Sequence, residues 1–350
     1  MGLLKYKMAR LTTFSRFLIT LAIVGAVVFA LFKFFPQLKS WKDGKMQEAT
    51  TTADARSDNN DNIGGGGNQT TTTNTNQIST GGDRVPFAYT PPMPVNGKLK
   101  GVVELGATGF NSFIIRVDAQ KNWKLERSEF GASLVYEKLA TDDDIKNGLK
   151  RYIADMLAFG VGPRDIHFVI SSGAKKVDIT SKIQQTLTSM GYVTNTVTAE
   201  KEGICGLKSC LPQAYRGNGF VVDIGSGNTK ISVAKGNSVQ SFESFGAKYF
   251  QNGTSDATVE SEVMSKCQAI PSQNRGICFV IGGIPFELAK QVRNGKERFT
   301  VLKAPGDYKA EGEKQKAGLN IYNAVAKSTG CKQFVFDWDA NFTIGFLLDM

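Results

Sequence analysis

Two stretches of this sequence share one pattern: Val221-Val222-Asp223-Ile224-Gly225-Ser226-Gly227-Asn228-Thr229 and, about 120 residues earlier, Val102-Val103-Glu104-Leu105-Gly106-Ala107-Thr108-Gly109. Each is an apolar run that ends in an acid, one more apolar residue and a glycine-containing segment, and each leads into another apolar run. This pattern predicts two strands joined by a tight turn. A single copy is typical of an ordinary β-hairpin, whereas two copies with the acid at the same offset favour a duplicated fold with two lobes.

The two predicted turns are suited to phosphate. Glycine lets the backbone approach a ligand closely, so its amide groups can donate to phosphate oxygens, and short polar side chains add donors. Two facing turns would hold a polyphosphate chain from both lobes. The strand-end acids Glu104 and Asp223 are predicted to hold Mg²⁺, directly or through water. The turn residues predicted to bind phosphate are Gly106, Thr108, Gly109, Gly225, Ser226, Gly227, Asn228 and Thr229.

The residues around these turns predict alternating strands and helices, which indicates an α/β fold. Helices are expected over 142–160, 178–190 and 254–268, and a last one from about Asn320. No G-x-x-x-x-G-K-[ST] motif occurs, and neither turn has the G-x-G-x-x-G form that leads into a helix. The predicted phosphate site is therefore built on hairpins.

Charge and rare residues exclude several classes of function. The chain of 350 residues has a net charge of +10, but the first 45 residues hold eight Lys or Arg and one acid, Asp43, which accounts for +7. The rest is near neutral, so no nucleic-acid partner is expected. A single histidine, His167, excludes a multi-His metal site and is expected in a strand. The cysteines are expected as free buried thiols, unless Cys205/Cys210 and Cys267/Cys278 pair outside the cytoplasm.

The N-terminal region predicts a tether. Residues 17–35 are apolar apart from Lys33 and are long enough for a transmembrane helix, preceded by a basic flank over 1–16. Residues 36–97 are a low-complexity linker whose composition cannot bury enough surface to fold. The sequence thus predicts a single-pass membrane protein that contacts the lipid bilayer through 17–35. Four basic residues on each side leave its orientation open, and a cytoplasmic body is favoured only because phosphate ligands are found there.

Four stretches of the body resemble the actin, heat-shock chaperone and sugar-kinase superfamily, and within it the exopolyphosphatase and guanosine pentaphosphate phosphatase family. They are GVVELGATGFNSFII, DDDIKNGLKRYIADMLAFGVGPRDIHFVISSGAKK, VTAEKEG with GFVVDIGSGNTKISV, and FVIGGIPFELAK. The resemblance implies a two-lobed, duplicated RNase H-like fold, that of the actin-like ATPases, with lobes over 98–215 and 216–350. It implies polyphosphate or a nucleoside polyphosphate as substrate, and it leaves a homodimer or a membrane-protein partner open.

The same resemblance assigns roles to further residues. Glu202 falls where the family has the general base that activates water, and Glu200 is an alternative. A solvated charge in the first turn of a helix is the other interpretation of Glu202. Gly282 and Gly283 correspond to a third turn, which in a nucleotide-binding protein would border the substrate.

Three departures from the family pattern stand out. Glu104 replaces the usual Asp, and Lys230 stands where the family has an acid, which adds a cation that attracts phosphate. Lys175 lies near a family arginine and could contact a polyanion or be an ordinary surface lysine. Three hypotheses follow: a phosphohydrolase, an actin-like nucleotide-binding module, and a catalytically degenerate scaffold that recruits partners.

Overall fold

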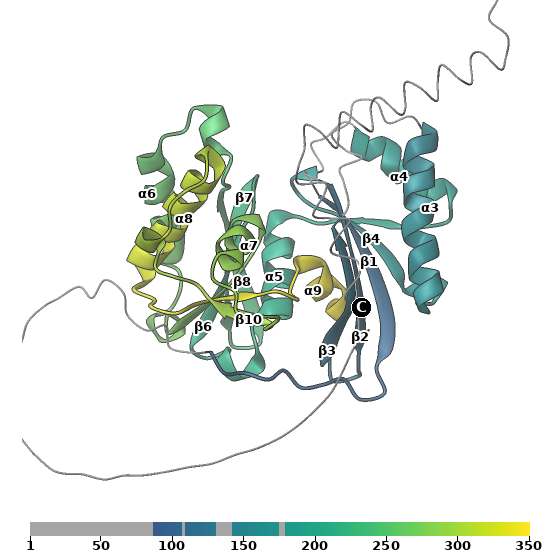
Figure 1. Ribbon diagram of the computed structural model, residues 1–350, viewed down its shortest axis with the longest axis horizontal. Coiled ribbons are helices and arrows are strands. Elements are labelled where there is room, and N and C mark those ends of the chain that lie inside the picture. Colours follow the sequence, from purple (N-terminus) through teal and green to yellow (C-terminus); the bar gives the residue numbers. More distant parts are fainter. Residues whose placement is uncertain (1–86, 107–108, 131–141, 175–178) are drawn as a thin grey trace, which may run out of the picture. The chain divides into compact units, whose positions relative to one another are not determined.

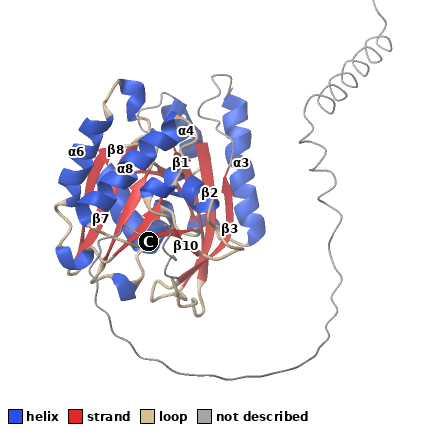
Figure 2. Ribbon diagram, turned by 60° about the vertical axis from the view of Figure 1, so that its left-hand side comes forward, coloured by secondary structure: helices blue, strands red, loops and turns tan. Residues whose placement is uncertain are grey.

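The computed structural model describes residues 87–106, 109–130, 142–174 and 179–350. These residues form two β-sheets with helices beside them (Figures 1 and 2). Several predictions concern residues outside the described ones: the span over 17–35, most of the linker over 36–97, and the side chains Thr108 and Lys175.

The first sheet has five strands. Three antiparallel strands form one part of the sheet, and two parallel strands extend it next to the first of them in the chain. The strands, in spatial order, are β3 (Trp123–Phe130), β2 (Gly109–Val117), β1 (Lys98–Gly106), β4 (Ile166–Ile170) and β5 (Thr194–Thr196).

The second sheet repeats this order and adds an antiparallel edge strand, β10 (Phe299–Val301). The five matching strands are β8 (Ser238–Phe245), β7 (Asn228–Lys235), β6 (Gly219–Ile224), β9 (Ile277–Ile281) and β11 (Phe334–Asp337). In both sheets an antiparallel three-strand meander is extended by two parallel strands. The duplicated α/β fold predicted from the two hairpins is therefore confirmed.

The helices follow the predicted positions with one exception. The stretch expected over 178–190 is α4 (Ile179–Ser189), and the stretch expected over 254–268 is α6 (Asp256–Cys267), where Ser255 caps the helix. The helix expected from about Asn320 is α8 (Glu313–Thr329), which begins earlier, directly after Gly312 with its φ of 83°. The sequence analysis identified neither β11 nor the short helix after it. The remaining helices are α3 (Asp142–Phe159), α5 (Ala199–Cys210), α7 (Gly283–Lys290) and α9 (Phe342–Asp349).

Strand alternation sends the two acids of the predicted site toward one region. In β1, Val103 and Leu105 pack against α3 and α4, whereas Val102 belongs to the cluster that contains α9. Glu104 shares the face of Val102, because side chains two residues apart lie on the same side of a strand. In β6, Val222 packs against α6 and α8, whereas Val221, on the face of Asp223, packs against α5. Both acids therefore face the layer that holds α5 and α9.

The helices α5 and α9 lie between the two sheets (Figure 1). They approach closely at Gly345, where a Cβ atom would overlap the backbone of Cys205. Asp349 at the end of α9 pairs with Lys201 at 2.7 Å and also with Lys208 of α5. This tight contact fixes α5, whose first turn carries Glu202.

Within the described ranges no helix is long and apolar enough to cross a membrane. The most apolar helix, α9, has 8 residues, far short of the roughly 20 that a bilayer requires. This finding corrects the predicted single-pass localisation. The span over 17–35, on which that prediction was based, is not among the described residues.

The cysteines and the histidine have the ordinary roles expected of them. All five cysteines are free and buried, so neither Cys205/Cys210 nor Cys267/Cys278 is paired. Burial raises the pKa of the Cys205 thiol to about 11, which makes it a poor nucleophile. His167 lies in β4, as predicted, and burial lowers its pKa.

Candidate functional site

The second hairpin turn is held by main-chain hydrogen bonds. The amide of Gly225 donates to the carbonyl oxygen of Asn228 at 3.1 Å. The chain after β8 closes the turn from outside, because Ala247 and Lys248 donate to the carbonyl oxygens of Gly225 and Ser226, both at 2.9 Å. Ser226 and Gly227 remain partly or fully exposed at its tip. The turn is therefore preformed and open to a ligand.

The third glycine turn meets the second hairpin at Asp223. Gly282 follows β9 with a φ of 102°, and a Cβ atom there would lie 2.5 Å from the Asp223 Oδ1 and 2.6 Å from the Ile224 carbonyl oxygen. Glycine is required for both reasons. Gly283, the first residue of α7, has no atom within 4 Å of its would-be Cβ. Only the first of these two predicted residues lies against the strand-end acid.

Lys230 is the centre of the site. It pairs in register with Asp223 across the hairpin, and its ammonium lies 2.6 Å from the Glu202 Oε2 and 3.5 Å from the Asp223 Oδ2. Burial lowers the pKa of Lys230, but the charges of Asp223 and Glu202 outweigh it and hold the pKa above its usual value. The lysine is therefore a permanently charged ammonium, buried between two carboxylates.

Glu202 reaches this ammonium from α5. Thr198 caps the helix by accepting from the Lys201 amide, so Glu202 lies in the first turn, directed by the cap toward the site. Its side chain is 1% exposed. While Oε2 pairs with Lys230, Oε1 accepts from the Ser172 amide at 2.5 Å. The solvated-charge interpretation of Glu202 is thus wrong for this residue, whereas Glu200 in the same turn is exposed.

Ser172 connects the two sheets at this point. It lies just after β4 of the first sheet, and its Oγ accepts from the Asn228 Nδ2 of the second hairpin at 3.2 Å. The same amide group of Asn228 also donates to Glu243 at 2.7 Å. One short segment of the first sheet therefore touches both the predicted base and the predicted phosphate turn.

Glu104, the acid of the first hairpin, lies in a different environment. Glu104 is 9% exposed and accepts from the Nδ2 atoms of Asn111 at 3.1 Å and Asn341 at 3.2 Å. Burial raises its pKa to about 7, and the charges of Glu202 and Asp223 add to the rise while the two amides oppose it. Gly106 and Gly109 close this hairpin as register partners.

The predicted Mg²⁺ ligands do not fit a divalent ion. Glu104 is bonded to amide groups and resists ionisation, and Asp223 pairs with an ammonium. Among the described residues no group of three or more His, Cys, Asp or Glu is arranged to hold a metal. The acids thus lie where predicted, but with neutral or cationic partners in place of a metal.

Thr229 does not join the phosphate turn. Alternation along β7 turns it away from Asn228 and Lys230, and its side chain is fully buried. In the described structure its Oγ1 has no hydrogen-bond partner, and neither has the Oγ of Ser244, its register partner. Among the side chains of the second turn that were predicted to bind phosphate, Ser226 and Asn228 therefore remain candidates.

Two site residues escaped the sequence analysis. Ser172 belongs to the Ser-Ser-Gly segment after β4, from which only the neighbouring Lys175 was selected. Asn341 caps α9, where its Oδ1 accepts from the Thr343 amide at 2.8 Å, and the same side chain donates to Glu104. An Asn before an apolar run is a helix-start signal, but nothing local indicates that the cap reaches the first hairpin.

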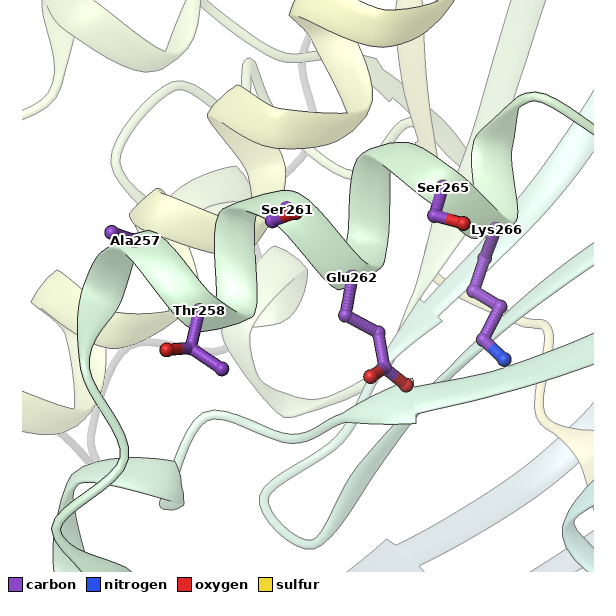
Figure 3. A pocket seen from close by; sticks show the side chains of 6 residues that line it. All are labelled: Ala257, Thr258, Ser261, Glu262, Ser265 and Lys266. Atoms are coloured by element: carbon purple, nitrogen blue, oxygen red, sulfur yellow. The ribbon is translucent and has the colours of Figure 1, made fainter.

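A shallow hollow elsewhere contains none of these residues. All its lining side chains come from the outer side of α6 (Figure 3): Ala257, Thr258, Ser261, Glu262, Ser265 and Lys266. Because a single helix supplies every lining group, nothing there converges on a ligand from several directions. The site of interest is the buried charge cluster between the sheets.

No protein-family profile matches this sequence, and no curated protein matches it either. Solved structures do match. The chain is similar to the PPX-GPPA enzyme of Aquifex aeolicus with a TM-score of 0.57 and 15% identity, over 72% of this chain and 99% of that one. It is also similar to an exopolyphosphatase from Cytophaga hutchinsonii with a TM-score of 0.55 and 14% identity, over 72% and 98%.

These similarities confirm the fold predicted from the resemblance. Both sheets have the strand order of a duplicated fold, and the match covers nearly the whole length of the solved structures. Since the identities are low, the agreement concerns the fold alone. The activity is therefore argued from the site.

Proposed function

We propose that this protein binds the phosphate chain of polyphosphate or of a nucleoside polyphosphate between its two sheets, and hydrolyses a phosphoanhydride bond there. The observation that supports it best is the linkage of Asn228, Ser172 and Glu202. It joins the open second turn to the residue at the predicted position of the base. The names of the structurally similar enzymes support the same substrate class.

In this proposal the second turn binds the ligand. The exposed tip offers main-chain amides at Ser226 and Gly227, and the Asn228 side chain lies beside them. Lys230 lies two residues further along β7 and supplies a buried positive charge. Amides and an ammonium attract phosphate oxygens by hydrogen bonding and by charge. The proposed lobes are 98–215 and 216–350, with the ligand between them.

The proposed chemical step needs an oriented water molecule. Its oxygen attacks the terminal phosphorus, the bridging P–O bond breaks, and the leaving phosphate oxygen carries away the electron pair. Glu202 accepts the proton of the water, a role for which a carboxylate is sufficient because phosphoryl transfer depends mainly on positioning. For this step Glu202 must offer a lone pair that neither Ser172 nor Lys230 uses.

That requirement favours a second candidate, a protein that binds the phosphate chain without cleaving it. Both oxygens of Glu202 are engaged, and the side chain is 1% exposed. A carboxylate held in this way stabilises the site and gives water little access. Such a protein would respond to its ligand by changing shape or recruiting a partner.

Phosphate release by the full chain separates the two. Polyphosphate, ATP, GTP and guanosine tetraphosphate are offered in turn, with wild type, Glu202→Gln and Glu200→Gln. Hydrolysis with Glu202 as base predicts a loss of about 10²–10⁴-fold in Glu202→Gln and near-normal release in Glu200→Gln. Saturable binding without release in the wild type supports the binding-only candidate. Release that is unaffected by Glu202→Gln contradicts the role of Glu202.

A further inference from the structure

Two buried acids of the site share a cation that the protein itself supplies. Glu202 and Asp223 are both buried, and Lys230, itself 8% exposed at its side chain, lies within 3.5 Å of both. Burying a carboxylate is costly unless a cation is close. Here the cation comes from the protein, on the strand next to that of Asp223. The ammonium therefore serves as a counter-ion to both carboxylates and offsets one of their two negative charges.

The position of the ammonium also excludes a metal at the same place. Mg²⁺ binds carboxylate oxygens at about 2.0–2.1 Å and requires near-octahedral oxygen ligands. Lys230 Nζ lies 2.6 Å from the Glu202 Oε2 and leans toward the Asp223 Oδ2 at 3.5 Å. It therefore occupies the space between the two acids, and its positive charge repels a divalent ion from both.

The rest of the surroundings keeps the lysine in place. Gly282 closes one side of Asp223, since even a methyl group there would overlap the carboxylate. Ser172 holds the other oxygen of Glu202 at 2.5 Å. Glu104, the third acid, is held by hydrogen bonds from Asn111 and Asn341. Lys230 is thus the cation of a cluster whose members are fixed by separate elements.

We propose that Lys230 takes the place of a divalent ion in this site, so that the protein binds its phosphate ligand without Mg²⁺. The ammonium is the shared counter-ion of Asp223 and Glu202, and the main-chain amides of the second turn bind the metal-free phosphate chain. The part of this proposal that concerns the ligand rests on the proposed function, whereas the part that concerns the metal does not.

The first test uses the wild-type full chain with no phosphate. MnCl₂ and MgCl₂ are titrated by calorimetry, in parallel with Asp223→Asn. We expect no saturable binding of either ion. Binding that is the same in Asp223→Asn would also agree with the proposal, because it would lie elsewhere on the protein. One-to-one binding that disappears in Asp223→Asn would overturn the proposal, since it would place a metal on the acid whose counter-ion is said to be Lys230.

The second test removes the ammonium. Lys230→Ser is expected to gain an Mn²⁺ site, seen as at least tenfold tighter binding than in wild type and as a rise in the unfolding temperature with added Mn²⁺. Lys230→Ser with Asp223→Asn should lose the gain. Lys235→Ser, at the exposed end of the same strand, is the matched control. A folded Lys230→Ser protein that gains no Mn²⁺ site contradicts the proposal; if this variant fails to fold, the wild-type titration decides.

The third test adds tripolyphosphate to the wild-type chain in EDTA and in excess Mg²⁺. Binding in EDTA that is at least as tight as in excess Mg²⁺ is expected, because Mg²⁺ forms a complex with tripolyphosphate in solution and lowers the concentration of the metal-free chain. Binding that falls tenfold or more in EDTA would overturn the proposal. If tripolyphosphate and nucleotides bind in neither buffer, the proposed function fails, and the two metal tests still decide the role of Lys230.

Discussion

The two hairpins each have an acid at the same strand position and a different residue opposite it. Glu104 of β1 pairs in register with Asn111 of β2, and Asp223 of β6 pairs in register with Lys230 of β7. Burial raises the pKa of Glu104 to about 7, and the neutral Asn111 amide opposes only part of this rise. The ammonium, by contrast, gives Asp223 and the neighbouring Glu202 a permanent counter-charge. A duplicated backbone thus supports two electrostatic environments, which differ in the cross-strand partner of the acid.

The largest effect is expected from removing the partner in the second hairpin. Lys230→Met leaves Glu202 and Asp223 buried without a cation, which should lower the free energy of unfolding by about 3–5 kcal/mol. The equivalent change in the first hairpin, Asn111→Ala, removes a hydrogen bond to a group that can stay neutral and should cost about 1–2 kcal/mol. Urea unfolding of both variants measures the difference. Equal losses would mean that the two environments do not differ as described.

The pH dependence of stability should distinguish the first hairpin. The folded state raises the pKa of Glu104 from 4.5 to about 7, so it holds a proton that the unfolded chain has released. Between these values the contribution of Glu104 falls as pH rises, by up to about 3 kcal/mol at 1.36 kcal/mol per pH unit. Glu104→Gln should remove this fall. Urea midpoints at pH 5 and pH 7.5 are compared in the two proteins, and an unchanged pH dependence in the variant would contradict the assignment.

The next largest effect on stability is expected where the third turn contacts the second hairpin. Gly282→Ala forces a Cβ to 2.5 Å from the Asp223 Oδ1 at a φ of 102°, which should cost about 1–3 kcal/mol. Gly283→Ala is the matched control, because open space surrounds that position, and it should change stability by no more than about 0.5 kcal/mol. Thermal unfolding compares the two variants. Similar shifts would show that Asp223 does not restrict this turn.

A smaller effect is expected from the helix cap beside the first hairpin. Asn341→Ala removes the cap of α9 and one donor to Glu104, at a cost of about 1 kcal/mol. Asn341→Asp keeps the cap but places a second carboxylate against Glu104, so it should raise the pKa of Glu104 further. The midpoint of the pH titration of stability measures this second change. If Asn341→Asp leaves that midpoint in place, the contact between the cap and Glu104 is not significant.

The sequence predicted local features well. Strand patterns a few residues long predicted the two hairpins, with their acids and turn glycines. Periodicity and caps predicted the helices α4 and α6. The helix start at Thr198 was recognised, but the Glu202 side chain in its first turn is buried and not solvated. The predictions that succeeded each depend on neighbours along the chain.

Contacts between distant segments could not be predicted in the same way. Ser172 meets Asn228, and Asn341 meets Glu104 from more than two hundred residues away. Lys230 was identified as a departure from the family pattern, but its pairing with Glu202 depends on how α5 packs against β7. Thr229 was assigned to the phosphate turn although strand alternation buries it on the other face.

Binding of tripolyphosphate to the full chain tests the central claim, that the second turn holds a phosphate chain. Calorimetry compares wild type, Ser226→Glu, which adds a carboxylate at the second turn, and Ser238→Glu, which adds one at the exposed first residue of β8, beside the other end of β7. We predict one-to-one binding in wild type, a loss of at least tenfold in Ser226→Glu, and no more than about a twofold change in Ser238→Glu. No binding in wild type, or equal effects of the two substitutions, would contradict the account.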